Sequence, residues 1–376
     1  MSLTGLVLGT GFAGQGHSAA LRSASVEVVG MVGRTPEVLD RVATDLEIPY
    51  TSTNWLGALS DLKPDIVAIG TPGGAHVKPI MAALAHNCHI FCDKPLAPTA
   101  ADAKKLYREA KKAGVKTAYA ASFRYQPHVL LAKELIAQGA IGEPQEVECI
   151  SHYNLNPLIP FGWSHRLDQG GGRLNNNFTH VLSIVLHVLD GEVLQVNGTT
   201  RSDMTHAPIV AGNHHFLERH KLAPDSADDP SLEWGESDAE WSYTVQVQIG
   251  SPFAQSQPTS ALFKHSGLQP RYQPDYVAIY GSKSAIYIKG YYGTGPLFVY
   301  KNGDWNEVPV PDHIMVDQPN IEDHTQRNWN ILMRHFAADI RGEAHEPYQT
   351  FADGALYQQI IDHIRAGDGW HDLSGK

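Results

Sequence analysis

Residues 170–180 read GGGRLNNNFTH, and this stretch joins residue types that can transfer a proton beside a bound ligand. The histidine, His180, titrates near neutral pH and can act as a general acid or base. Asn176 lies one helical turn earlier, so both side chains can face one pocket. Its amide can donate to and accept from a substrate hydroxyl, but it cannot take a proton. The three glycines allow a tight turn before the helix, which we expect Asn175 or Asn176 to begin.

A second group of glycines lies near the start of the chain, where Gly9, Gly11 and Gly14 form a G-x-G-x-x-G pattern. An apolar run precedes the pattern, and a segment of helical character follows it. In this setting the first glycine permits a tight turn, the second lets a pyrophosphate approach the backbone, and the third lets helix and strand pack closely. The pattern therefore predicts a dinucleotide site; the alternative is a purely structural glycine turn.

The first third of the chain alternates between strand-like and helix-like segments, which predicts a parallel, doubly wound Rossmann sheet. We expect this NAD(P)-binding domain to span residues 1–123, with its ligand at the carboxyl ends of the strands. Strands are expected at 3–9, 26–34, 65–72, 89–95 and 116–124, and helices at 11–23, 35–46, 77–87 and 99–114. The residues expected to bind the cofactor at the strand ends are Gly9, Gly11, Phe12, Ala13, Gly14, Arg34, Thr35, Thr71, Pro72, His76, Asp93 and Lys94.

The end of the second predicted strand bears on the choice between NAD and NADP. An NAD site usually places an acid there, on the ribose diol. This chain has Arg34 and Thr35 instead, and a guanidinium can bind a 2′-phosphate through two hydrogen bonds. We therefore expect a modest preference for NADP. An arginine that only covers the adenine ring or points into solvent would fit the same sequence.

After residue 123 the predicted strands follow one another without helices between them, which indicates a large open mixed or antiparallel sheet. We assign residues 124–376 to a C-terminal α+β domain for substrate binding and oligomerisation, with a C-terminal helix able to pack back on the first domain. One face of this sheet needs a cover, so we expect a homodimer or homotetramer through it. Residues 203–239 lack a clear period and are expected to form a lid, an interface arm or a flexible insert. Strands are expected at 144–154, 240–250 and 276–290, and helices at 128–142, 328–342 and 350–367.

The composition of the 376 residues argues against several kinds of partner. A net charge of −11 without a long basic run disfavours nucleic acid, and no apolar run is long enough to cross a membrane. The chain starts without the features of a signal peptide, and its three cysteines have no metal spacing, so we expect reduced thiols in a cytoplasmic protein. The HHFLERH segment (214–220) invites a metal interpretation, but no site geometry supports it and we expect no metal.

Seven motifs, taken in order, resemble those of the Gfo/Idh/MocA oxidoreductases, the family of glucose–fructose oxidoreductase and inositol dehydrogenase. They are GLVLGTGFAGQGH (5–17), DIVAIGTPGGAH (65–76), IFCDKPLAPTAADAKKL (90–106), SFRYQPHVLLAKELIAQGAIGE (122–143), GWSHRLDQGGGRLNNNFTH (162–180), IYGSKSAIYI (279–288) and YQTFADGALYQQIIDHI (348–364). The resemblance runs over nearly the whole chain. It implies a Rossmann domain, a mixed-sheet domain that carries substrate contacts, and often dimers or tetramers.

In that family the lysine of an E-K-P signature and a histidine on a later helix line the site beside the nicotinamide. Lys94, in CDKP, and His180 match these positions, which implies that both are catalytic. The chain departs from the family at Asn176, where an aspartate is common, at Phe178, where a glycine is usual, and at Ser183, where an acid is usual. Either Lys94 and His180 move the proton without an acid, or the activity is reduced or absent.

The resulting expectation is an NAD(P)-dependent dehydrogenase or reductase that acts on a CH–OH group of a sugar, polyol or related cyclic compound. One alternative is a dinucleotide-binding regulator without turnover. Another is a reductase of a non-sugar carbonyl, with an acidic substrate held by Arg124 or Arg166; two arginines converging on one point would favour it. The residues expected to contact the substrate are Asn176, Arg124, Tyr125, Tyr153, Trp163, His165 and Arg166.

Overall fold

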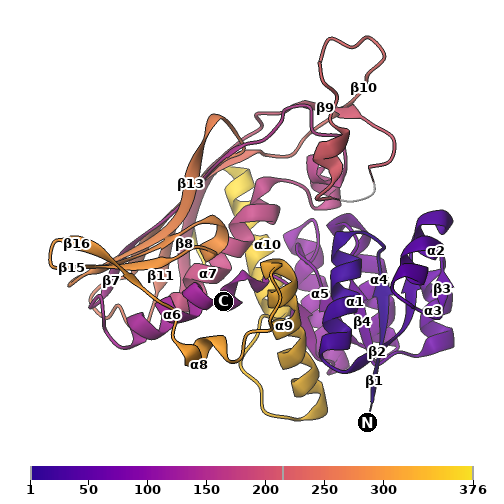
Figure 1. The fold of residues 1–376 in the computed structure, drawn as a ribbon, viewed down its shortest axis with the longest axis horizontal. Helices are drawn as coiled ribbons and strands as arrows, with labels where there is room; N and C mark the ends of the chain where they lie inside the picture. The colour runs from indigo at the N-terminus through magenta and orange to yellow at the C-terminus, as the bar shows by residue number, and fades with distance from the viewer. Residues whose placement is uncertain (1, 214–215, 375–376) are drawn as a thin grey trace.

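The computed structural model describes residues 2–213 and 216–374, except the side chains of residues 270–274 and 291. The first part is a six-stranded parallel sheet in the order β3-β2-β1-β4-β5-β6, so the expected doubly wound sheet is confirmed (Figure 1). Its elements are β1 (Leu3–Leu8), α1 (Phe12–Ser23), β2 (Val26–Val32), α2 (Pro36–Asp45), β3 (Thr51–Ser52), α3 (Trp55–Leu62), β4 (Ile66–Ile69), α4 (Val77–Ala85), β5 (His89–Cys92), α5 (Ala100–Ala113) and β6 (Thr117–Tyr119).

Strand β1 is mostly apolar, with Leu6, Val7 and Leu8 fully or nearly fully buried, because both faces of this sheet are covered. Leu6 and Leu8 belong to the hydrophobic cluster that includes residues of α3 and α4. Val7, which points to the opposite face, belongs to a second cluster with residues of α1 and of a late helix, α9 (His324–Arg341). A parallel strand that is buried on both faces has a nearly continuous run of hydrophobic residues, and this run made the strand predictable from the sequence.

The second part is a nine-stranded sheet in the order β16-β15-β14-β13-β7-β12-β11-β8-β17, in which only the β12–β7 pair is parallel, so the expected mixed sheet is also confirmed. Its strands are β7 (Pro144–Asn154), β8 (Glu192–Arg201), β11 (Ser242–Gly250), β12 (Thr259–Ser266), β13 (Leu268–Gly281), β14 (Ala285–Lys289), β15 (Leu297–Lys301), β16 (Asp304–Val308) and β17 (His371–Asp372). The remaining helices are α6 (Pro127–Ala137), α7 (Thr179–Leu189), α8 (Asp312–Met315) and α10 (Phe351–Ala366).

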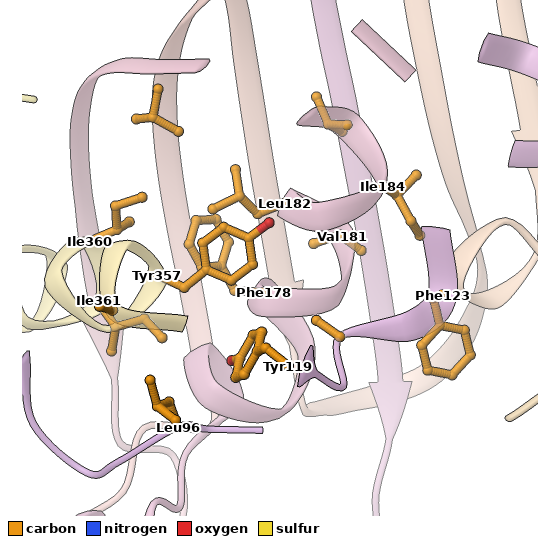
Figure 2. Packing of buried hydrophobic residues seen from close by; sticks show 14 of the residues in the cluster. Leu96, Tyr119, Phe123, Phe178, Val181, Leu182, Ile184, Tyr357, Ile360 and Ile361 are labelled. Carbon is orange, nitrogen blue, oxygen red and sulfur yellow. The ribbon is translucent and has the colours of Figure 1, made fainter. Parts of the chain in front are cut away.

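The two sheets share one continuous hydrophobic core. Figure 2 shows Tyr119, from the first part, near Phe178 at the start of the α7 segment and near Tyr357 of α10. The rings of Tyr119 and Tyr357 lie 6.0 Å apart in an edge-to-face arrangement. The core therefore fixes α7 relative to the Rossmann sheet, which is needed if residues from both parts are to build one site.

The last two long helices pack on the first part of the chain, as Figure 1 shows for the yellow and gold segments. Helix α9 lies on α1 so closely that a Cβ at Gly16 would lie 2.2 Å from the Trp329 ring. Helix α10 lies on α5, where Asp362 accepts a hydrogen bond of 2.7 Å from the Ala100 backbone N–H. The domain boundary after residue 123 stays a prediction, but these contacts tie the C-terminal helices to the Rossmann sheet.

Residues 203–239 contain more structure than the sequence predicts. They include a two-stranded ribbon of β9 (His206–Ile209) and β10 (Glu233–Glu236), which protrudes at the top of Figure 1, and a single 3₁₀ turn at Arg219–Leu222. Residues 214 and 215, which begin the HHFLERH segment, lie outside the described part. Among the described residues no helix is long and apolar enough to traverse a membrane, and no cluster of three metal-ligating side chains occurs.

Candidate active site

The turn between β1 and α1 has its shape because its key positions are glycines. Gly9 has a φ of +116°, and a Cβ there would lie 2.6 Å from the carbonyl oxygen of Gly70. A Cβ on Gly14 would lie 1.9 Å from the carbonyl oxygen of Gly9. Gly11 precedes α1 without a side-chain cap, which leaves the N–H groups of the first helical turn for an anionic ligand. This geometry fits the pyrophosphate of a dinucleotide.

The other predicted cofactor residues gather at the same edge of the sheet. Thr71, at the end of β4, has a buried hydroxyl without a hydrogen-bond partner among the described residues, the kind of atom that a ligand can satisfy. Arg34, after β2, is exposed and makes no ion pair within the described chain. The predicted set at this edge is Phe12, Ala13, Arg34, Thr35, Thr71, Pro72, Asp93 and Lys94.

His76 lies behind this edge, with its side chain fully buried. Its Nε2 is 2.7 Å from the carbonyl oxygen of Thr71, and its Nδ1 is 3.3 Å from that of Leu96. The ring thus connects the loop after β4 to the loop after β5. Burial lowers the pKa of His76, so the neutral ring has one N–H, which suits the carbonyl oxygen of Thr71, while Nδ1 lies 3.4 Å from the Cys92 thiol. We therefore assign the side chain a positioning role.

Lys94 and Asn176 meet across the boundary between the two sheets. The Lys94 ammonium donates a hydrogen bond of 2.8 Å to Oδ1 of Asn176. The Asn176 amide nitrogen in turn donates one of 2.8 Å to the carbonyl oxygen of Gly172. Burial lowers the pKa of Lys94 and Arg173 lowers it further, whereas the neighbouring Asp93 opposes the shift. An amide suits this position because it accepts from a cation on one side and donates to a carbonyl on the other.

His180 lies in the first turn of α7 and is 6 % exposed. Its ring packs against Phe123 at 4.6 Å and Tyr292 at 5.0 Å between centroids, and its Nδ1 is buried without a partner among the described residues. Burial, followed by the charges of Lys94 and Arg173, holds the pKa of His180 well below its ordinary value. The imidazole is therefore neutral at neutral pH, the form in which it can accept a proton.

The asparagines do not begin the helix, contrary to the sequence-based expectation. Residues Leu174–Phe178 form a π-helical turn that starts after Arg173 and runs directly into α7. The Asn175 and Asn176 amides donate to the carbonyl oxygens of Gly171 and Gly172, one turn earlier. These side-chain bonds stabilise a helical geometry that is otherwise rare and that is associated with functional sites.

Arg173 lies next to this candidate site and was not among the residues predicted from the sequence. It is 9 % exposed, its guanidinium lies 5.1 Å from the centre of the Tyr153 ring, and its Nε donates 2.8 Å to Nε2 of His265. Because that nitrogen accepts, the proton of the His265 ring must be on Nδ1, which donates 2.6 Å to the Ser151 hydroxyl. Arg173 lies seven residues before His180, two helical turns, and this spacing was the signal that could have revealed it.

Of the predicted substrate residues, Tyr153, Trp163 and His165 lie near this group. Tyr153 contacts both Arg173 and His265, whose ring is 4.8 Å away. The rings of Trp163 and Phe216 lie 5.2 Å apart and are tilted by 31°. His165 is fully buried, and burial is the main cause that lowers its pKa to about 4. Aromatic surfaces and neutral imidazoles of this kind suit a polar ring substrate.

Arg124, Tyr125 and Arg166 are not brought into contact with Lys94, Asn176 or His180 in the described part of the chain. Arg124 donates 2.6 Å to Nδ1 of His187, two turns beyond His180 on α7. Tyr125 is buried beside α9, and Arg166 pairs with Asp168 at 2.7 Å on the surface. Their predicted role in substrate binding stays a prediction that this geometry does not favour.

The two other departures from the family pattern have packing explanations. Phe178 is fully buried and fills the space between the helix and the large sheet, with ring centroids 5.2 Å from Phe263 and 5.7 Å from Tyr243. The Ser183 hydroxyl donates 3.1 Å to the carbonyl oxygen of Ala121. Neither residue points to a lost active site, because each is satisfied in its own surroundings.

A parallel sheet with a glycine turn at its carboxyl edge, joined to a mixed sheet that supplies a helix histidine, defines a two-domain, dinucleotide-binding class of protein. The chain belongs to the Gfo/Idh/MocA family. Residues 3–121 match the family's oxidoreductase, NAD-binding Rossmann fold, and residues 129–254 match its C-terminal domain. The first sheet is therefore a NAD-binding Rossmann domain.

Individual relatives are more distant. Levoglucosan dehydrogenase of Pseudarthrobacter phenanthrenivorans is 27% identical over 223 residues, 56% of this chain and 57% of that protein. The 2,7-anhydro-N-acetylneuraminate hydratase of Escherichia coli is 28% identical over 53% of each chain. The chain thus spans little more than half the length of the curated relatives it matches. A solved structure of levoglucosan dehydrogenase in complex with NADH and levoglucosan aligns over 100% of both chains at 21% identity with a TM-score of 0.80, which shows a shared fold.

Proposed function

We propose that this protein is an NAD(P)-dependent oxidoreductase that transfers a hydride between a nicotinamide and a CH–OH carbon of a sugar, polyol or related cyclic compound. The observation that carries the proposal is the meeting of Lys94, Asn176 and His180 at the carboxyl edge of a Rossmann sheet. Relatives named as levoglucosan dehydrogenase and inositol 2-dehydrogenase support the reaction class.

Oxidation of a CH–OH group releases a hydride and a proton. The nicotinamide, when bound, supplies the hydride acceptor. We assign the proton to His180, which is neutral and buried beside Phe123 and Tyr292. Lys94 donates to the substrate oxygen and orients it, and Asn176 holds the Lys94 ammonium through its amide oxygen. All three are residues of this chain, and no metal is required in this scheme.

A panel of sugars and polyols tests the proposal, with each nicotinamide cofactor and with the absorbance of the reduced cofactor as the signal. Turnover of at least one compound is expected. If the protein binds a nicotinamide cofactor tightly but turns over none of the panel, the regulator interpretation becomes the better one.

We further propose the modest preference for NADP that Arg34 and Thr35 suggest. Arg34 is exposed and has no acidic partner in the described chain, so it is available to a 2′-phosphate. Arg34→Ala should weaken NADP binding by one or two charge-assisted hydrogen bonds, about 1.5–3 kcal/mol each, and leave NAD binding nearly unchanged. Calorimetric titration with both cofactors measures this. Equal weakening of both would mean that Arg34 does not read the phosphate.

The neutral amide at position 176 has a testable effect on the pH profile. In Asn176→Asp a carboxylate would lie beside Lys94 and one turn from His180, and it would raise the pKa of both by favouring their charged forms. As the pH rises, the Lys94 ammonium would persist to a higher pH than in the wild type. As the pH falls, His180 would become protonated already at a higher pH than in the wild type. Both limbs of the kcat/KM profile should therefore move to higher pH. An unmoved profile with full activity would show that Asn176 does not face the reacting groups.

We also propose a cytoplasmic location, because the three cysteines are all unpaired thiols.

We further propose a homodimer or homotetramer that forms through the uncovered face of the large sheet. Tyr276 and Tyr287 stack at 5.2 Å on that face, and Trp305, 40% exposed, lies next to Tyr287. Exposed aromatic groups of this kind mark association surfaces. Light scattering across a concentration series measures the oligomeric state, and a monomer at all concentrations would contradict the proposed oligomer.

A further inference from the structure

Two buried arginines in and next to the candidate site have no acidic partner among the described residues. Arg173 is 9% exposed and Arg219 is 7% exposed. The Nη2 of Arg173 is buried and has no acceptor among the described residues. Arg219 donates to the Ser164 hydroxyl, and its guanidinium lies 4.2 Å from the centre of the Phe216 ring. No carboxylate of the described chain lies within ion-pair distance of either guanidinium.

The two guanidinium groups are held by neighbouring parts of the backbone. Ser164, which holds Arg219, also accepts a backbone hydrogen bond of 3.1 Å from Gly172, the residue before Arg173. Burial, and then the charge of Arg173, lowers the pKa of Arg219 to about 10. Arg173 also lowers the pKa of both Lys94 and His180. The site therefore contains a row of neighbouring positive charges, which runs from Arg219 through Arg173 to Lys94, next to His180.

The acidic residues near these three cations do not pair with the two arginines. Glu240 is held by Arg365 through both carboxylate oxygens, at 3.0 and 3.1 Å. Asp93 accepts 2.9 Å from the backbone N–H of Lys94. Asp275 is buried, and burial raises its pKa to about 7, so it is only partly charged at neutral pH. The site thus has an excess of positive charge, to which an oxidised nicotinamide would add.

Burying a cation without a partner is costly, and a guanidinium is shaped to bind a carboxylate through two hydrogen bonds. From this geometry we propose that the substrate carries a carboxylate, bound between Arg173 and Arg219, so that it is an acidic sugar or a polyhydroxy acid and not a neutral one. The inference rests on the proposed function and narrows its substrate class. The carboxylate is bound and unchanged; the hydride and proton leave the CH–OH group as described above.

The same charge would assist the chemistry. Lys94 and Arg173 disfavour a proton on His180, which makes the imidazole a weak base in the free protein. A substrate carboxylate would offset these charges and raise the proton affinity of His180 only when the acidic substrate is bound. The arginines that the sequence suggested for this task are engaged elsewhere, since Arg124 contacts His187 and Arg166 pairs with Asp168, so their predicted role is less favoured by this geometry.

Matched pairs of compounds test the inference: D-glucuronate with D-glucose, D-galacturonate with D-galactose, and D-gluconate with D-sorbitol. For at least one pair, kcat/KM with the preferred cofactor should favour the acid about tenfold or more. Arg219→Gln should lower the value for that acid about 10- to 150-fold, the loss expected for a charge-assisted hydrogen bond, and leave the neutral partner nearly unchanged. Arg201→Gln, which removes an exposed arginine paired with Asp203, is the matched control and should change neither.

Arg173→Gln is expected to give the same selective loss, but Arg173 also holds His265 in the core. Arg219→Gln is the safer variant, because Arg219, although buried, begins a short 3₁₀ turn whose other residues are exposed. If none of these compounds is turned over, their binding is measured instead, by calorimetric titration of each pair into the protein with reduced cofactor bound. Tighter binding of an acid, lost in Arg219→Gln, supports the inference; no preference for any acid overturns it. Neutral compounds turned over as well as acids would reject the carboxylate and keep the proposed function, whereas no turnover of any sugar or polyol would reject the function.

Discussion

Replacing His180 with alanine should lower turnover on the true substrate about 10²–10⁴-fold, the usual contribution of a general base. The imidazole is well placed for this task, since it is buried beside Phe123 and Tyr292 and neutral at neutral pH. Cofactor affinity should not change, because the cofactor is expected at the glycine turn after β1. Steady-state rates on the substrate found in the panel, with calorimetric cofactor titration of the same variant, measure the two effects separately.

His187→Ala is the matched control, because His187 lies on the same helix two turns further on and contacts Arg124 instead of Lys94. It should keep turnover near that of the wild type. Near-full turnover in His180→Ala would reject the assignment of the base and leave Lys94, whose pKa burial also lowers, as the candidate. A loss of cofactor affinity in His180→Ala would show that the variant disturbs the site more broadly.

The pH dependence of the wild type follows from the same two groups. Since the pKa of His180 is held well below its ordinary value, the base form persists through neutral pH and is lost only in acid. Since burial also lowers the pKa of Lys94, its ammonium is lost earlier than usual as the pH rises. Activity should therefore be highest in the pH range between the pKa of His180 and the pKa of Lys94.

Much of the fold could be predicted because local sequence carries it. Buried parallel strands read as apolar runs, and the helices between them have caps such as Thr99 before α5 and Gly114 after it. Strand β3, of two residues, and the ribbon of β9 and β10 have no period that could reveal them. Strand β12 was missed as well, and its parallel pairing with β7 joins residues far apart in the chain, which no local pattern records.

The site was predictable where chemistry and spacing agreed, and less so where tertiary contacts decide. Asn176 and His180 are four residues apart and both lie close enough to Lys94 to interact with it, so their proximity could be inferred from sequence. Arg173 lies in the same stretch, but an arginine beside glycines is usually exposed, and only its contact with His265 shows otherwise. Arg219 lies in a segment without periodicity, and its approach to Ser164 depends on the fold of residues 203–239.

The glycine turn before the asparagines depends on a buried ion pair, and breaking that pair should have the largest effect on stability. Glu240 is 3% exposed, accepts from Arg365 through both oxygens, and accepts 2.9 Å from the backbone N–H of Leu174. A Cβ at Gly172, where φ is +90°, would lie 2.1 Å from its Oε1, so only glycine lets the carboxylate approach the turn. Arg365 also donates 3.2 Å to the carbonyl oxygen of Gly171.

Glu240→Ala should therefore lower the free energy of unfolding by about 3–5 kcal/mol, because it leaves the Arg365 cation and the Leu174 N–H without their partner. Urea denaturation followed by tryptophan fluorescence measures this. Asp168→Ala is the control: it breaks an ion pair of 2.7 Å whose side chains are about half exposed, and it should cost no more than about 1 kcal/mol. Equal losses in the two variants would mean that the Glu240 pair is no more important than a surface contact. A loss confined to Glu240→Ala, accompanied by reduced turnover, would tie α10 through this carboxylate to the turn that places Arg173 and Asn176.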